Sequence, residues 1–194
     1  MTTATIKTAN ASDEAGVIGV LTLAFSSDPM ARWSQPDPQQ HLAHFPFIAK
    51  AFGGNAFAQQ TAYFADGYAG AALWLPPGCG PDEETMIGWV ERTAPDAIKG
   101  DLFGVFEEMA KYHPKEPHWY LPLIGVDPFQ QGNGIGSALM KHALIPCDRD
   151  GTLAYLESSN PRNISLYERH NFKVIGEIQV GSSPTMRPML REPQ

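Results

Sequence analysis

The sequence predicts an α/β protein in which a mixed sheet lies between layers of helices, an αβα sandwich. Two observations predict this class. Segments with the apolar period of a strand alternate along the chain with segments that have the period of a helix. An apolar run over 121–126, typical of a strand that is buried on both faces, also leads through a glycine-rich turn into a helical stripe. With 194 residues, 43% of them hydrophobic, we expect a single domain over 1–194.

In the N-terminal half, capping residues and turn residues set the expected boundaries. Asn10 and Ser12 can cap a helix that ends between residues 26 and 29, and Asp66 with Gly67 predicts a tight turn between two strands. The proline-punctuated segment 30–38 predicts a loop. The expected elements are a strand over 5–8, helices over about 13–26 and 39–52, strands over 57–65 and 68–75, and helices over 82–94 and 99–112.

In the C-terminal half, the strand over 121–126 is expected to end at Asp127 and Pro128, and the glycine-rich helix that follows it is expected to stop at Pro146. A strand over 153–157 then leads into a turn over 160–163, where Asn163 can cap a short helix that carries Leu166, Tyr167 and His170. Candidate closing strands lie over 172–180 and 185–190.

The composition narrows the class of function. Twenty-one acidic residues against 14 basic residues give a formal charge of -7, which argues against a nucleic-acid surface, because phosphate neutralisation needs clustered Lys and Arg. The sequence has no run of 18 apolar residues and no signal-peptide pattern at its start, so we expect a cytoplasmic protein without membrane contact. Cys79 and Cys147 are isolated, which favours two free thiols and no metal site. The oligomeric state is left open between monomer and homodimer.

Three glycines stand at every second position where the helix after the 121–126 strand begins. Without side chains at Gly132, Gly134 and Gly136, several backbone N–H groups can converge on one anion at the positive end of the helix. The dinucleotide pattern Gly-x-Gly-x-x-Gly is absent, and so is the Gly-Lys-Ser/Thr of nucleoside-triphosphate loops. The pattern that is present begins at Gln131 and reads Gln-x-x-Gly-x-Gly, which predicts a phosphate or pyrophosphate site.

This pattern, after a strand that ends Val-Asp-Pro, resembles the acetyl-CoA signature of the GNAT N-acetyltransferase superfamily. The segments 115–120, 156–163 and 166–169 look like the puromycin N-acetyltransferase branch of that superfamily, and the matching region covers residues 111–178. Two positions depart from the family pattern. Asn171 replaces a common Gly but suits a left-handed helix cap, and Asn133 stands where a cation is common.

The resemblance implies a GNAT-like sheet, mixed but mostly antiparallel and splayed at the cofactor strand, and it divides the chain into an acceptor-side half over about 1–110 and an acetyl-CoA half over about 111–194. It also implies direct acetyl transfer from acetyl-CoA to an amine in a ternary complex, without a metal. In the family a distortion of this strand frees an N–H for the acetyl carbonyl, and Gly125 would permit one here. The implied cofactor-binding residues are Ile124, Gly125, Val126, Gln131, Gly132, Asn133, Gly134, Ile135, Gly136, Ser137, Asn163 and Tyr167.

Two residues are candidates for proton transfer. Tyr167 lies one helical turn beyond Asn163, so both are expected to point toward the cofactor, and a phenol suits proton donation to a leaving thiolate. Glu157, at the end of the 153–157 strand, is the candidate base, directly or through water, or it binds a cationic acceptor or pairs with Arg162. His118 is a further candidate base, with a structural role as the alternative.

The acceptor site is expected in the N-terminal half. Its candidate contacts are Asp28, Trp33, Trp119 and Glu157, with Met30 and Arg32 in the same region. His142 and His170 are expected to be ordinary polar positions on helices. The preferred substrate is the amine of a small molecule. The alternatives are a protein or peptide acetyltransferase and a non-catalytic acyl-CoA-binding sensor, and intact Tyr167 favours the enzyme.

Overall fold

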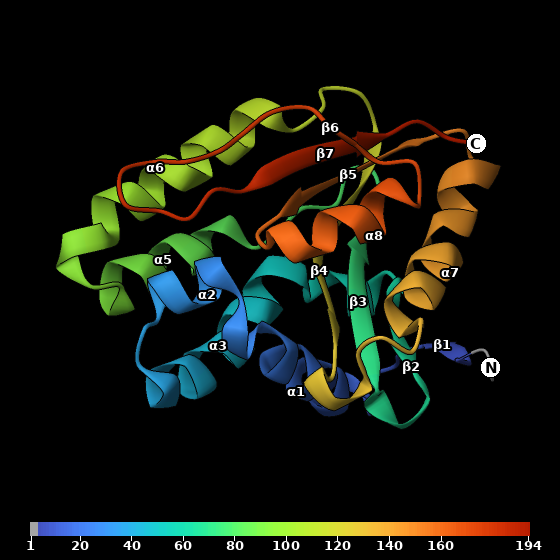
Figure 1. Ribbon diagram of the computed structural model, residues 1–194, viewed down its shortest axis with the longest axis horizontal. Helices are drawn as coiled ribbons and strands as arrows, with labels where there is room; N and C mark the ends of the chain where they lie inside the picture. The colour runs from blue at the N-terminus through green and yellow to red at the C-terminus, as the bar shows by residue number, and fades with distance from the viewer. Residues whose placement is uncertain (1–3) are drawn as a thin grey trace.

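A seven-stranded mixed sheet forms the centre of the protein, in a computed structural model that describes residues 4–194 (Figure 1). Its strands, in sheet order, are β1 (Ile6–Thr8), β2 (Ala62–Ala65), β3 (Gly70–Leu75), β4 (His118–Val126), β5 (Leu153–Ser158), β7 (Arg187–Arg191) and β6 (Lys173–Val174). The pair β4 and β5 is parallel, and the other pairs are antiparallel. This architecture confirms the predicted mixed, mostly antiparallel sheet.

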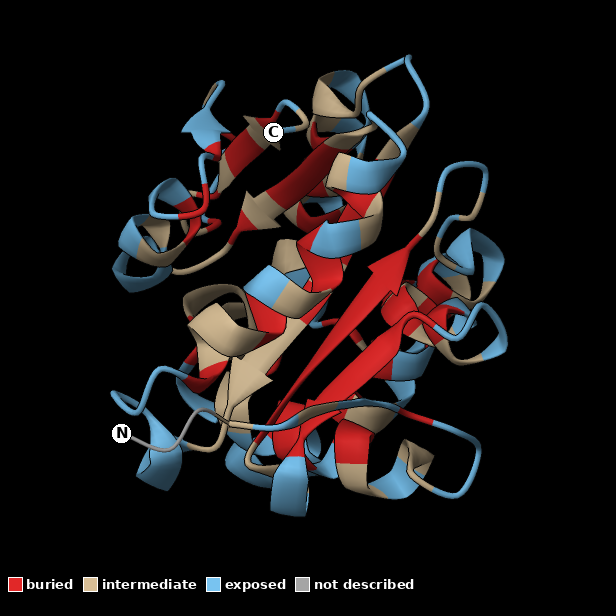
Figure 2. Ribbon diagram, turned by 90° about the vertical axis from the view of Figure 1, so that its right-hand side faces the viewer, coloured by how far each residue is buried: buried red, intermediate tan, exposed pale blue. Residues whose placement is uncertain are grey.

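The helices cover both faces of the sheet. They are α1 (Glu14–Ala24), α2 (Pro29–Ser34), α3 (Pro38–Gly53), α4 (Asn55–Ala58), α5 (Glu83–Thr93), α6 (Asp96–Tyr112), α7 (Ile135–Arg149) and α8 (Ile164–Glu168). Alternate strand residues bury against opposite layers, with Trp119 and Leu121 in the core beneath α7 and Tyr120 in the core beneath α1 and α3. Figure 2 shows the central strands buried between these layers.

The sheet splays between β4 and β5, as predicted. The two strands pair only where residues 118–120 face residues 153–155, whereas β4 continues along β3 to Val126. Beyond Tyr120 the backbones of β4 and β5 therefore diverge. The opening between them is where a ligand can lie along the unpaired edge of β4.

The distortion of β4 lies at Pro122 and not at Gly125, so the expected role of Gly125 is wrong. Leu73 pairs with Leu123 and Leu75 pairs with Tyr120, so β4 has one residue more than β3 in this interval. Gly125 stays in register with Ala71. Its glycine is needed for packing, because a Cβ there would lie 2.5 Å from the Cβ of Ala24 on α1.

Several expected boundaries are wrong. Residues 29–34 form α2 and not a loop, because Asp28 caps the helix by accepting from the Ala31 N–H and Pro29 occupies its first position. The expected strand over 57–65 begins only at Ala62, since α4 precedes it. Helix α7 continues through Pro146, because residues on both sides of the proline keep its buried face packed.

Smaller differences concern the ends of elements. Asn10 accepts from the Ser12 N–H in a turn before α1, and the residue at the N-cap position is Asp13, without a side-chain cap. The expected closing strands shorten to β6 and β7, which pair with each other, and an isolated bridge links Ile178 to Met186 in the segment between them. Asn171 has φ of 66°, which is the left-handed conformation predicted for it.

Candidate functional site

The residues predicted to bind a cofactor gather along one cleft of about 410 Å³. It runs between the splayed end of β4, the glycine loop before α7, and α8, and Ala24, Phe25, Ser27 and Asp28 complete it from the N-terminal half. The predicted residues that line it are Ile124, Gly125, Val126, Gln131, Gly132, Gly134, Ile135, Gly136, Ser137, Asn163 and Tyr167. Asn133 is the exception, because it does not line the cleft and its amide donates to the Gln130 carbonyl.

The glycine loop supplies backbone donors at the start of α7. Gly132 and Gly134 have φ of 80° and 79°, a conformation that L side chains rarely adopt. Gly134 is the N-cap and makes no side-chain cap bond, so the first N–H groups of the helix are available to a ligand. An anion such as a pyrophosphate fits this position, since the positive end of the helix dipole also points there.

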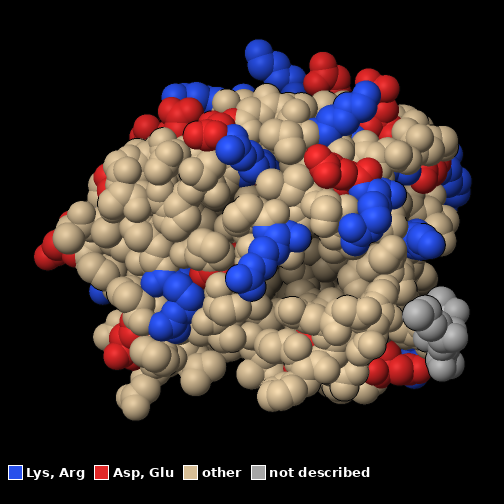
Figure 3. All heavy atoms as spheres, viewed as in Figure 1, with Lys and Arg blue, Asp and Glu red and all other residues tan. Residues whose placement is uncertain are grey.

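Two arginines that the sequence reasoning did not assign to the cofactor line the same cleft; Arg162 was considered there only as a partner of Glu157, whose neighbour in the structure is His113. Arg162 lies in the turn before α8 and Arg169 lies just after α8. Figure 3 shows basic side chains along the edge of the hollow that lies below α8 in that view. Their guanidinium groups bring positive charge to the lining of the cleft. Their spacing of two helical turns from one another was a usable signal in the sequence.

Helix α8 presents Asn163 and Tyr167 to the cleft from one face. The side chain that caps the preceding turn is Asn160, which accepts from the Arg162 N–H, so the expectation that Asn163 caps the helix with its side chain is wrong. The Asn163 amide is thereby available to a ligand. Burial raises the pKa of Tyr167, and the Asp28 carboxylate raises it further. The phenol is therefore protonated at neutral pH, as a proton donor must be.

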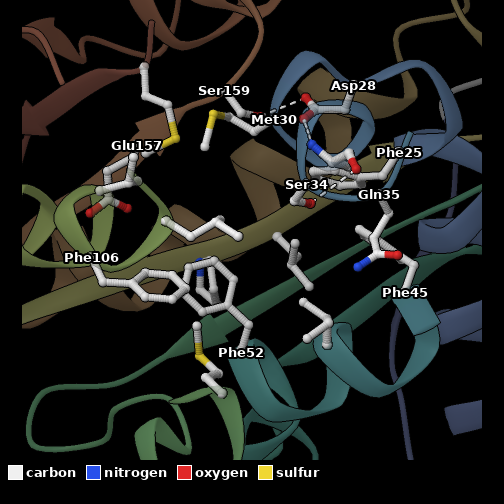
Figure 4. A pocket seen from close by; sticks show the side chains of 18 of the residues that line it. Phe25, Asp28, Met30, Ser34, Gln35, Phe45, Phe52, Phe106, Glu157 and Ser159 are labelled. Carbon is white, nitrogen blue, oxygen red and sulfur yellow. Dashed lines mark hydrogen bonds between the residues drawn. The ribbon is translucent and has the colours of Figure 1, made fainter. Parts of the chain in front are cut away.

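A second, largely apolar cavity of about 150 Å³ adjoins the cleft and is shown in Figure 4. We call it the inner cavity. Its walls come from α2, α3, α5, α6, β4 and β5, and its polar groups include Asp28, Glu157 and Ser159. Asp28 and Phe25 line both the inner cavity and the cleft. The two spaces therefore meet at these residues.

The carboxylate of Asp28 is held at this junction by two hydrogen bonds. It accepts from the Ser159 hydroxyl at 2.7 Å and from the Ala31 N–H at 3.1 Å (Figure 4). The residue is 6% exposed. Burial raises the pKa of Asp28, and the two hydrogen bonds oppose that rise. A carboxyl with a raised pKa accepts a proton more readily than an ordinary aspartate.

Glu157 lines the inner cavity from the end of β5, with its side chain 4% exposed. Its Oε1 lies 3.2 Å from Nε2 of His113, which follows the last turn of α6. The aromatic rings of His113, Tyr120 and Tyr155 pack against one another beside it. Burial raises the pKa of Tyr120, and Glu157 raises it further. Sequence reasoning found Glu157 but missed His113, which no local pattern marks.

The structure places both predicted tryptophans outside the walls of the inner cavity. Trp119 is in the core beneath α7, since strand alternation turns it away from the side on which Tyr120 lies. Trp33 packs against the cluster around Trp89, and its Nε1 donates to the Ser182 hydroxyl. Arg32 donates to the Pro36 carbonyl and is not part of the cavity wall, whereas Met30 is.

The remaining histidines have different surroundings. His118 does not line the inner cavity, and its Nδ1 lies 2.9 Å from the Glu116 carbonyl oxygen. His142 packs edge-on against Tyr63. His170 is not an ordinary polar position, because a hydrogen bond of 2.9 Å joins its Nε2 to the hydroxyl of Ser137 in the first turn of α7. Its pKa is lowered by burial and by Lys141 and other nearby cations.

Within residues 4–194, no three histidine, cysteine or acidic side chains are grouped closely enough to hold a metal ion. In the same part of the chain, no helix combines the length and the apolar character that a membrane span requires.

Known proteins share this sequence pattern and this fold. The family model for the acetyltransferase (GNAT) family matches residues 57–172. A Schizosaccharomyces pombe protein described as an uncharacterized N-acetyltransferase is 29% identical over 145 residues, which are 66% of this chain and 58% of that protein. The chain thus spans less than two thirds of the length of this relative.

Solved structures of acetyltransferases have a similar fold. A structure from Corynebacterium glutamicum, described as histone acetyltransferase HPA2 and related acetyltransferase, is 26% identical with a TM-score of 0.71, over 100% of this chain and 98% of that chain. The polyamine N acetyltransferase of Drosophila melanogaster shares the fold at 15% identity and a TM-score of 0.65, over 97% and 99% of the two chains. The match of the family model to more than half of the sequence settles the classification: the chain belongs to the GNAT family of acetyltransferases.

Proposed function

We propose that the protein transfers an acetyl group from acetyl-CoA directly to the amine of a small, largely apolar molecule. The observation that carries this proposal is the junction at Asp28 and Phe25, where the cleft and the inner cavity meet. Donor and acceptor bound in these two spaces are in contact at the same time. A ternary complex therefore needs no covalent enzyme intermediate.

The cleft has the features that acetyl-CoA requires. The glycine loop and the start of α7 offer N–H donors to the pyrophosphate, with Arg162 and Arg169 as counter-charges. Beyond its pairing with β5, β4 leaves an edge along which the pantetheine amides can bind as an added strand. When bound, acetyl-CoA supplies the activated acetyl group.

Tyr167, Asp28 and Glu157 then have distinct roles. The phenol of Tyr167, which its raised pKa keeps protonated at neutral pH, donates its proton to the thiolate that leaves. Asp28 binds the ammonium group at the junction and accepts its proton, because it lies where the two spaces meet. Glu157, which lies beside His113 deeper in the wall, attracts the cationic amine into the inner cavity before its ammonium group reaches Asp28.

The shape of the inner cavity favours a small molecule over a peptide. Its lining is dominated by Phe, Met, Leu and Ile side chains, and its volume of about 150 Å³ is comparable to a cavity that holds one benzene-sized group. Solved proteins of the same fold include a fly enzyme named for acetylating polyamines and a mosquito arylalkylamine N-acetyltransferase. These names support an amine of low molecular mass.

The test is the release of CoA thiol from acetyl-CoA across a panel of amines. The panel includes arylalkylamines, polyamines, puromycin-like aminonucleosides, amino acids and short peptides, and compares the wild type with Tyr167→Phe. For the best amine, kcat is expected to fall at least tenfold in the variant, which corresponds to about 1.4 kcal/mol of transition-state stabilisation. Tyr63→Phe is the matched control, since Tyr63 is similarly buried but lies beneath α7, away from both spaces.

Three other outcomes would contradict parts of the proposal. Turnover of peptides with no turnover of small amines would point to a peptide acetyltransferase. Tight binding of acetyl-CoA without transfer to any amine would point to a sensor. Equal kcat for wild type and Tyr167→Phe would remove Tyr167 from the mechanism.

A further inference from the structure

An outer cavity of about 670 Å³ lies next to the inner cavity and has no role in the transfer step proposed above. The two cavities share the side chains of Phe52, Met86, Phe106 and Met109. Figure 4 shows Phe52 and Phe106 at the same end of the inner cavity. These shared side chains form a partition with one cavity on each side.

The partition contains flexible side chains. Two of its members are methionines, whose unbranched side chains adapt to the shape of a ligand. A pair of polar side chains also lies between the two cavities. Glu157 lines the inner cavity, His113 lines the outer cavity, and Glu157 Oε1 lies 3.2 Å from His113 Nε2. Side chains thus separate the two cavities at these points, and side chains can change rotamer.

The outer cavity has an apolar wall and an acidic rim. Pro81, Ile87, Phe103, Ala110 and Tyr120 supply apolar surface in addition to the partition. Glu83 and Glu107 are its carboxylates, and no Lys or Arg is among the described residues that line it. Such a space accepts an apolar chain whose far end is neutral or positively charged, and it repels an anionic end.

We propose that the outer cavity binds the distal part of an elongated amine, whose reacting amine lies at Asp28 while its apolar body passes the partition. The inner cavity alone has room for roughly a benzene-sized group, so a longer acceptor must extend through one of its walls. The wall toward the outer cavity is apolar and adaptable. This assignment rests on the proposed function and adds the substrate class: a long amine with an apolar middle.

The first test measures kcat/KM for n-alkylamines from propylamine to octylamine. Once the chain passes the partition, each buried methylene is expected to raise kcat/KM about threefold to fourfold. Ala110→Trp fills the outer cavity from an exposed position of α6, and is expected to lower the octylamine-to-propylamine ratio at least tenfold. Ala97→Trp, also exposed on α6 but outside the cavity lining, is the matched control and should leave this ratio unchanged.

The second test compares far ends of opposite charge at the same chain length. After division by two for its two equivalent amines, the kcat/KM of an α,ω-diamine is expected to exceed that of the matching ω-amino carboxylate at least threefold. The double variant Glu83→Gln with Glu107→Gln is expected to bring this ratio close to one, and the effect should shrink in high salt because both carboxylates are exposed.

Failure of this inference is distinguishable from failure of the proposed function. If propylamine is acetylated but kcat/KM does not rise with chain length, or if Ala110→Trp leaves the octylamine-to-propylamine ratio unchanged, the inference is overturned. If no amine is acetylated, the proposed function fails, and calorimetric binding of octylamine to the CoA-saturated wild type and Ala110→Trp still decides the inference. Equal affinities of the two proteins would refute it.

Discussion

The substitution Asp28→Asn tests the junction between the two spaces directly. Asparagine keeps the acceptor oxygen for the Ala31 N–H, and it is as good an N-cap as aspartate, so α2 should persist. The second carboxylate oxygen, which accepts from the Ser159 hydroxyl, is replaced by an amide group that can instead donate to that hydroxyl. The charge at the reacting centre is lost. Because burial raises the pKa of Asp28, the ionised carboxylate costs the folded state stability above the pKa of an unfolded aspartate. The variant should therefore unfold at the same temperature as the wild type, or at a higher one, at pH 7.

The expected loss of activity is large. Removal of one partner of a buried charged pair costs about 2–5 kcal/mol, so kcat/KM for the amine should fall about 30-fold to a few thousand-fold. The pH profile changes as well. In the wild type, kcat/KM should fall as the pH drops through the raised pKa of Asp28, which is a higher pH than for an ordinary aspartate. This acidic limb should be absent from the profile of Asp28→Asn.

The assay is CoA thiol release from pH 5 to 9 with the best amine, together with thermal unfolding. Asp37→Asn is the matched control, because Asp37 caps α3 through the Gln39 and Gln40 N–H groups and does not line either space. The reasoning is refuted if Asp28→Asn stays within threefold of the wild type over the whole pH range. If Glu157→Gln then shows the loss and the missing limb, Glu157 is the base.

Three further predictions concern the cleft and the scaffold. Arg162→Gln and Arg169→Gln should each weaken acetyl-CoA binding about threefold to tenfold at low salt, and less in 0.5 M NaCl, as measured by calorimetry; equal affinities would remove both from the phosphate site. Gly125→Ala should lower the free energy of unfolding in urea by about 1–3 kcal/mol, because the new Cβ collides with α1. Asp148→Asn should cost about 1–3 kcal/mol at pH 7, because it leaves the buried guanidinium of Arg191 without its carboxylate. Since Arg191 lowers the pKa of Asp148, this difference should begin to shrink as the pH falls below about 4 and should vanish only once the pH is below the lowered pKa. A difference that does not shrink in acid would contradict the assignment.

The cofactor side of the site was predictable because its signal is local. A strand, three spaced glycines and a helix start are contiguous in sequence, and the left-handed φ values at Gly132 and Gly134 confirm why glycine is needed there. The turn and short helix that carry Asn163 and Tyr167 are equally local. The missed helix α2 was also predictable, because Asp28 followed by Pro29 is a standard helix start.

The acceptor side was not predictable in the same way, because its wall is assembled from segments far apart in the chain. His113 meets Glu157 only when the end of α6 packs beside β5. The large side chain of Trp33 suggested a pocket wall, yet hydrophobic burial is non-directional and the residue packs against the cluster around Trp89 instead. Composition and periodicity do not predict which residues from distant segments of the chain pack together.

The extra residue of β4 at Pro122 determines which side chains of the strand face the inner cavity, and the proline that marks it is present in the sequence. In a regular strand, Leu121 and Leu123 point to the same face, and a uniform reading of the apolar run places both beneath α7. The extra residue at Pro122 reverses this alternation, so Leu123 lies with Tyr120 in the core beneath α1 and α3, and the neighbours Pro122 and Leu123 both line the inner cavity. Proline cannot donate to a neighbouring strand and is confined within sheets to edges, strand starts and bulges, so its presence inside a central strand already indicated a bulge. The bulge lies where β4 leaves β5, and a single interruption of the strand therefore accompanies the opening of the cleft and shapes the wall of the inner cavity.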